Sequence, residues 1–176
     1  MAKNGYIIES QIAAKDVDAF NKSAVATADV DGGALVTLGA INTDGLFVAT
    51  VATAGTGGNV WMAYNPSEHF TKVGDNVYAG LSKDPRDYTN LANRPMDVFK
   101  PQVGDIITLT DGNIKTGETV TVGSFLEIGA NGYEAQASAT ASTFSLEVIE
   151  VKSIPFPQAG IGFEAANAYV CRVAFN

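Results

Sequence analysis

The stretch Met96–Thr110, MDVFKPQVGDIITLT, contains the clearest strand entry in the 176-residue sequence. Pro101 fixes φ and lacks an N–H group, so a strand can begin after it but cannot run centrally through it. Gly104-Asp105 is typical of a turn, because a flexible residue precedes one that hydrogen-bonds its own backbone. The β-branched and apolar residues of Ile106–Leu109 then favour a strand. This stretch therefore predicts the entry to a β-barrel or a β-sandwich.

Further strand and turn signals lie on both sides of this stretch. Segments 34–41 and 46–52 flank Asn42–Gly45, whose Asp-Gly ending predicts a hairpin turn. Asn131-Gly132 is the strongest hairpin signal in the chain and predicts a positive φ at Gly132. Apolar residues alternate over 144–148 and again over 169–175, as in strands with one buried face. With no sustained helical period, the sequence predicts an all-β fold, a single compact β-barrel or β-sandwich domain with short strands.

Two local features refine the second half of the chain. The apolar pattern changes parity at Ile149, which predicts a β-bulge. Pro155 and Pro157 predict that the strand is broken there. Cys171 alternates with core residues, so we expect a small buried hydrophobic side chain.

Residues 1–33 differ from the rest and predict an extended N-terminal arm, followed by a β-barrel or β-sandwich domain over 34–176. The simplest interpretation of such a segment is a frayed terminus. Tyr6, Ile7 and Ile8 favour an arm that becomes ordered on a partner, because solvated tails rarely carry three large apolar residues in a row. These three residues are therefore candidate partner-binding residues.

The charge balance excludes several classes of partner. The net charge is −8, from 11 basic and 19 acidic residues, and no cluster of Lys and Arg occurs. We therefore expect binding neither to nucleic acid nor to anionic membranes. The beginning of the sequence lacks the apolar run of a signal peptide, and no stretch approaches the ~20 apolar residues of a membrane helix. One cysteine excludes an intrachain disulfide, so we expect a soluble protein made in a reducing cytosol.

Charged residues make up only 17% of the chain. A surface with so little charge is compatible with a face covered by another protein, and equally with loops of small polar residues.

The sequence contains little that indicates catalysis, a metal or a cofactor. His69 is the only histidine, and it lies in an expected turn without a nucleophile motif around it. One histidine and one cysteine cannot build a structural zinc site. Asp29–Gly33 lacks the later glutamate of a calcium loop, and Gly55–Gly58 is not followed by the helix that phosphate binding needs. We therefore expect a protein without enzymatic activity, cofactor or metal.

Two sets of residues leave other functions open. Glu127, Glu147 and Glu150 could be paired carboxylates of a glycosidase, although alternation along strands more simply marks solvent-facing positions. The aromatic residues Trp61, Tyr64 and Tyr78 could stack on a sugar, although single aromatics on short strands more often anchor a core or an interface.

Six segments in about the first 110 residues carry a resemblance. They are 4–8 (NGYII), 20–26 (FNKSAVA), 29–32 (DVDG), 60–66 (VWMAYNP), 84–90 (DPRDYTN) and 99–105 (FKPQVGD). Together they resemble a group of tailed-phage virion proteins that we associate with capsid decoration, or cement, proteins. None of these motifs is catalytic, so they indicate a family without identifying a site.

The resemblance implies a non-enzymatic protein that binds the outside of an assembled phage shell and braces neighbouring capsomers. The implied partner is the major capsid protein, and self-association into a homo-oligomer is a second option. The implied location is the capsid exterior, after synthesis in the cytoplasm of the bacterial host. The alternatives are a carbohydrate-binding β-module that attaches a virion to a host surface through Trp61 and Tyr64, and an enzyme with a carboxylate site.

Overall fold

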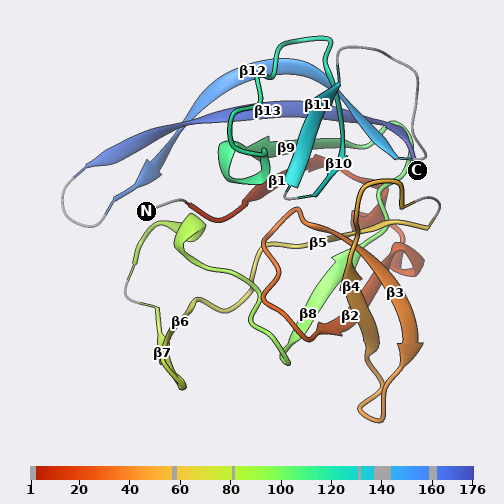
Figure 1. The fold of residues 1–176 in the computed structure, drawn as a ribbon, viewed down its shortest axis with the longest axis vertical. Coiled ribbons are helices and arrows are strands. Elements are labelled where there is room, and N and C mark those ends of the chain that lie inside the picture. The colour runs from red at the N-terminus through yellow and green to blue at the C-terminus, as the bar shows by residue number, and fades with distance from the viewer. Residues whose placement is uncertain (1–2, 57–58, 81, 131, 137–143, 159–161) are drawn as a thin grey trace.

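The structure, a computed structural model, describes residues 3–56, 59–80, 82–130, 132–136, 144–158 and 162–176. Figure 1 shows a sheet lying across one side of a barrel, so the predicted all-β fold with a barrel is confirmed. The strands are β1 (Ile7–Gln11), β2 (Asn21–Ala26), β3 (Leu35–Ile41), β4 (Phe47–Val51), β5 (Trp61–Ala63), β6 (Phe70–Val73), β7 (Asn76–Ala79), β8 (Pro95–Phe99), β9 (Ile106–Thr110), β10 (Phe125–Gly129), β11 (Gly132–Gln136), β12 (Ser145–Pro157) and β13 (Phe163–Phe175). In the part of the chain that the structure describes, four short 3-10 helices connect some of them: η1 (Ala13–Lys15), η2 (Asp18–Phe20), η3 (Pro85–Asp87) and η4 (Asp111–Asn113). The described residues include no helix of the length and apolar character needed to span a bilayer.

The strands of the described residues are distributed over three sheets. A closed barrel has the order β2-β4-β3-β5-β8, in which β2 and β4 are parallel and the other neighbours are antiparallel. An antiparallel six-stranded sheet has the order β1-β9-β13-β12-β10-β11. The hairpin β6–β7 forms a two-stranded sheet of its own. The stretch that begins at Met96 spans two of these units, because β8 belongs to the barrel and β9 to the six-stranded sheet.

Most of the buried apolar residues form two clusters, and successive residues of a barrel strand alternate between them. One cluster contains barrel residues such as Leu35, Met62 and Phe99 together with Leu109 and Cys171 of the six-stranded sheet. The intervening barrel residues form a second cluster, made mostly of small side chains such as alanine and valine. Since successive side chains of a strand point to opposite faces, the second cluster fills the barrel and the first joins it to the sheet.

The predicted N-terminal arm over residues 1–33 is wrong, because its described part is built into both layers. Ile7 pairs with Leu109 in the six-stranded sheet, and Asn21 pairs with Phe99 in the barrel. Ile7 is completely buried. Of the apolar residues that indicated an arm, Ile7 and Ile8 therefore belong to a first strand and Tyr6 directly precedes it, and the boundary expected at residue 34 falls inside the barrel.

Side-chain amides join the barrel to the six-stranded sheet. Asn65 accepts a hydrogen bond from the Ile7 amide at 2.9 Å and donates one to the Ile7 carbonyl at 2.7 Å. It therefore satisfies the free edge of β1 as a neighbouring strand would. Asn113 likewise accepts from the Tyr6 amide at 3.1 Å and donates to the Gly32 carbonyl at 2.7 Å.

Several predicted local features are confirmed. The Asn42–Gly45 turn connects β3 and β4, and the register of β12 shifts between Val148 and Glu150, where the bulge was expected. Gly129 pairs with Gly132 in the β10–β11 hairpin, and Gly132 has φ +99°. Asn131 lies outside the described residues. Cys171 is buried, as its alternation predicted.

The strand break expected at Pro155 and Pro157 is wrong. Both residues lie in β12 and pair with Ala165 and Phe163 of β13. Among the described residues, this part of β12 has no second neighbour in the six-stranded sheet, because β10 pairs with β12 only at Leu146 and Glu147. A proline is tolerated on such an edge, since its missing N–H leaves no ladder bond unmade on the open side.

We predict that Gly132→Ala destabilises the protein more than Gly117→Ala does. Both glycines have positive φ, and each substitution should cost about 1–2 kcal/mol for the backbone conformation alone. A Cβ at Gly132 would also lie 2.5 Å from the Asn113 carbonyl oxygen, whereas a Cβ at Gly117 meets nothing within 4 Å. Urea unfolding of the two variants measures the difference, and equal losses of stability would contradict the close approach of β11 to η4.

Candidate interaction site

The structure separates the three candidate residues near the start of the chain. Ile7 is in the core, while Ile8 is 37% exposed on β1. Tyr6 is half-buried, with its ring edge-on to Phe156 at a centroid distance of 5.7 Å. Burial, with a smaller contribution from the charge of Glu9, raises the pKa of the Tyr6 hydroxyl. Of these three side chains, Ile8 has the largest exposed fraction.

Trp61 and Tyr64 do not form an exposed aromatic platform. Trp61 is only 7% exposed and belongs to the cluster that fills the barrel. The ring of Tyr64 lies 4.6 Å from that of Phe99, and its hydroxyl donates to Asn21 Oδ1 at 3.0 Å. Burial raises the pKa of Tyr64 to about 12. The two aromatics on which the carbohydrate-binding alternative depended are thus largely packed inside the protein.

Packing, burial or an ion pair accounts for the surroundings of most residues considered for catalysis. His69 stacks on Tyr88, with ring centroids 4.5 Å apart and an interplanar angle of 2°. Burial raises the pKa of the Cys171 thiol to about 12, so the nucleophilic thiolate is scarce at neutral pH. Glu147 makes an ion pair with Arg172, and Glu150 is exposed. No group of three or more potential metal ligands lies together in the part of the chain that the structure describes.

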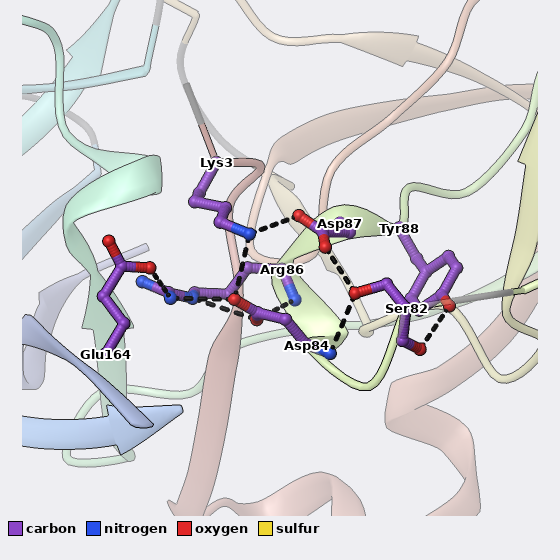
Figure 2. A network of polar contacts seen from close by, with 7 residues as sticks. All are labelled: Lys3, Ser82, Asp84, Arg86, Asp87, Tyr88 and Glu164. Atoms are coloured by element: carbon purple, nitrogen blue, oxygen red, sulfur yellow. Dashed lines mark hydrogen bonds and ion pairs between the residues drawn. The ribbon is translucent and has the colours of Figure 1, made fainter. Parts of the chain in front are cut away.

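The most strongly built polar feature is a buried ion pair at η3, shown in Figure 2. Asp84 is the N-cap of this short helix, and Pro85 occupies its first position, as both residue types prefer. Asp84 accepts hydrogen bonds from the Arg86 amide at 2.9 Å, from Arg86 Nε at 3.1 Å and from Arg86 Nη2 at 2.8 Å. The two side chains are only 1% and 2% exposed. In the sequence this segment was noted as one of those that carry the resemblance and not as a site, although the Asp-Pro-x-Asp pattern is itself a helix-start signal.

Opposing effects act on the charge of Asp84. Burial would raise the pKa of its carboxyl group, but hydrogen bonds from the Arg86 side chain, the Arg86 amide and Lys3 outweigh burial. The pKa of Asp84 therefore lies below its ordinary value of 3.8. Lys3 Nζ is 3.1 Å from Asp84 Oδ2 and 2.5 Å from Asp87 Oδ1, and the Asn4 amide donates to the Arg86 carbonyl at 2.9 Å. The η3 turn thus also holds the residues that precede β1.

The same turn anchors the outer end of the long β12–β13 hairpin. We call residues 153–157 and 163–167 the distal ribbon, because among the described residues they pair only with each other. Arg86 Nη2 bonds Glu164 Oε2 at 2.8 Å, and its Cζ lies 4.2 Å from the centre of the Phe156 ring. Figure 1 shows this ribbon reaching beyond the rest of the sheet.

The opposite face of the distal ribbon is open and uncharged. Phe163 is 74% exposed. The exposed residues of this face are Ser153, Pro155, Phe163, Ala165 and Asn167. A face that combines exposed apolar groups with no charge is suited to contact with another protein.

A second projecting element, the β6–β7 hairpin, joins the body next to η3. Besides the stacking of His69 on Tyr88, the Gly80 amide donates to the His69 carbonyl at 2.6 Å. Val73 and Tyr78 lie on one face of the hairpin and are 60% and 51% exposed. A hairpin this short gains little stability from its own contacts, so its position depends on the contacts at its base.

A scan against protein-family models, a search of curated proteins and a search of solved structures found no match for this chain.

We predict that Arg86→Met destabilises the protein by about 3–5 kcal/mol, because it removes the buried partner of the Asp84 carboxylate. The double variant Asp84→Leu/Arg86→Met should recover part of this loss. A suitable control is Arg94→Met, which removes an exposed guanidinium 4.8 Å from the Phe70 ring and should cost about 1 kcal/mol or less. Denaturant unfolding of the three variants tests the prediction, and similar losses for Arg86→Met and Arg94→Met would contradict it.

We also predict that the contribution of Asp84 to stability disappears in acid. Because its pKa is lower in the folded than in the unfolded protein, this contribution is complete above the unfolded value of 3.8 and is lost as the pH falls through the folded value. The difference in unfolding free energy between the wild type and Asp84→Asn should therefore be largest near about pH 6 and should shrink below about pH 4. A difference that stays constant over this range in urea titrations would contradict the lowered pKa.

Proposed function

We propose that this chain is a non-enzymatic structural protein of a tailed-phage virion, which binds the outer surface of the capsid and stabilises it. Its partner would be the major capsid protein, and its location the exterior of the capsid. Six motif segments that resemble capsid decoration proteins support this family of functions. The fold supports a binding role through one main observation: two projecting β-elements present exposed apolar side chains and share one rigid base.

The shared base at η3 is important for a binding role. Arg86 fixes the distal ribbon through Glu164 and Phe156, and Tyr88 supports the β6–β7 hairpin through His69. Elements that are already held in place lose little conformational entropy on binding, so more of the contact energy becomes affinity. A protein that braces a shell needs such pre-ordered contacts, because each copy must hold its neighbours in a fixed geometry.

The exposed apolar side chains set the scale of the expected effect. Covering a large apolar side chain contributes roughly 1.5–3 kcal/mol, and about 1.4 kcal/mol corresponds to a tenfold change in affinity. Loss of Phe163 from a contact with the shell should therefore weaken binding about tenfold or more.

We predict that the purified chain co-sediments with phage shells assembled without it and raises the temperature at which those shells open. Phe163→Ser, and separately Val73→Ser/Tyr78→Ser, should weaken co-sedimentation about tenfold without changing the melting of the free chain. Val103→Ser is the matched control, since Val103 is 67% exposed but lies on neither projecting element. Failure of the wild-type chain to bind or stabilise the shells would overturn the proposed function.

A further inference from the structure

A cavity of about 410 Å³ lies where the barrel meets the six-stranded sheet. We call it the seam cavity. The turn over residues 29–33, the adjoining parts of β3 and β4, and the β10–β11 hairpin form its walls. Its volume lies within the range of roughly 300–1,000 Å³ that is usual for binding sites, so it can accept a long side chain.

The inner wall of the seam cavity is apolar and firmly held. Its apolar residues are Val30, Ala34, Leu35, Val51, Ala52, Ile128 and Tyr133. The Tyr133 hydroxyl donates to the Gly33 carbonyl at 3.0 Å, so β11 is tied to the turn over residues 29–33. Val51 is 46% exposed, which leaves apolar surface accessible to a molecule that enters.

Two carboxylates, Asp29 and Asp31, also line the cavity. Asp29 Oδ1 accepts from the Ala92 amide at 2.7 Å, and Asp31 Oδ2 accepts from the Gly5 amide at 3.2 Å. These bonds fix both groups but use one oxygen of each. Within the described residues, neither carboxylate has a cationic side chain in ion-pair contact. A carboxylate offers about four acceptor positions, so both retain capacity to bind a cation.

We propose that the seam cavity receives a lysine or arginine side chain of the shell protein, and this assignment rests on the function proposed above. The aliphatic stem of such a residue lies along the apolar wall, and its cationic head bonds to Asp29 and Asp31. Lysine and arginine have this combination, an apolar stem that ends in a charge. The complementarity of charge selects a cation over neutral side chains of similar length, and the net charge of −8 further disfavours acidic ones.

Occupation of the cavity should stabilise the folded chain. The cavity is lined by the barrel and by the six-stranded sheet, so a bound side chain contacts both layers at once. A ligand that binds only the folded state raises the melting temperature, and the rise increases with the ratio of ligand concentration to Kd. The thermal stability of the chain therefore reports on the cavity without any shell being present.

The first experiment uses the isolated chain and blocked amino acids as probes. N-acetyl-lysine methylamide and N-acetyl-arginine methylamide should raise the melting temperature, while N-acetyl-norleucine methylamide, which has the stem without the charge, should have little effect. The shift should decrease as salt is added, because screening weakens the attraction of the carboxylates. Asp29→Asn/Asp31→Asn should reduce probe affinity about tenfold, since hydrogen bonds to charged groups are the stronger ones.

The asparagine variant keeps one carbonyl oxygen at each position, so the bonds from Ala92 and Gly5 can persist and the fold should be retained. A second pair of variants separates the cavity from overall charge. Val51→Lys places a cation at the cavity wall, where it should compete with the probe and weaken shell binding about tenfold. Val48→Lys adds the same charge on the same strand, at a position outside the cavity lining, and should leave both unchanged.

The outcomes distinguish this inference from the function on which it rests. Loss of both probe and shell binding in Asp29→Asn/Asp31→Asn and in Val51→Lys, but not in Val48→Lys, would support the inference. Shell binding by the wild type that all these variants retain would overturn the inference and leave the proposed function standing. Failure of the wild type to bind shells would overturn the proposed function and with it the shell protein as partner. In that case, probe binding would still decide whether the cavity takes a cationic side chain.

Discussion

Arg86 and Asp84 are charged groups removed almost completely from water, and the cost of their burial constrains every segment around them. Two bonds between the side chains and one from the Arg86 amide to Asp84 satisfy much of the hydrogen-bonding capacity of the pair. Lys3 makes a further ion pair with Asp84, Glu164 makes one with Arg86, and the Arg86 guanidinium lies over the Phe156 ring. Because a buried charge is tolerated only when its partners are complete, three segments distant in sequence must meet at one short turn. The outer parts of the protein thus acquire a fixed arrangement that a small apolar contact would not impose.

The junction between barrel and sheet uses a different device. Asn65 and Asn113 place side-chain amides where a neighbouring strand would otherwise place backbone groups. An amide side chain has the donor and acceptor of a peptide group, so it can end a sheet without leaving an edge open for aggregation. This close approach leaves no room for a Cβ at Gly33, where the ideal position is 2.8 Å from Asn113 Nδ2. The glycines of this turn are therefore a steric requirement of the junction.

Local rules predicted much of the fold but little of the candidate site. Asn131-Gly132 and the parity change at Ile149 act through neighbouring residues, and both indicated the correct local structure, a hairpin and a bulge. The prediction of an arm was wrong because Tyr6–Ile8 look unpartnered in the sequence. Their neighbour in the sheet, β9, lies about a hundred residues further along the chain. Proline at 155 and 157 breaks a central strand but not an edge, and only the topology shows that these positions lie on an edge. Arg86 likewise pairs with both Asp84 and Glu164, and no short sequence motif connects Glu164 to the other two.

The position of β1 beside β9 has a consequence for the order in which the protein can fold. The Tyr6 amide bonds to Thr110 and Asn113, residues 104 and 107 positions further along the chain. β9 in turn lies between β1 and β13, and β13 ends at Phe175. The six-stranded sheet therefore cannot form completely until β13 has been synthesised. Its strands must also pair across long stretches of sequence, and such pairing slows folding. During synthesis the apolar face that will cover the barrel remains exposed, and the period of greatest aggregation risk precedes the arrival of β13.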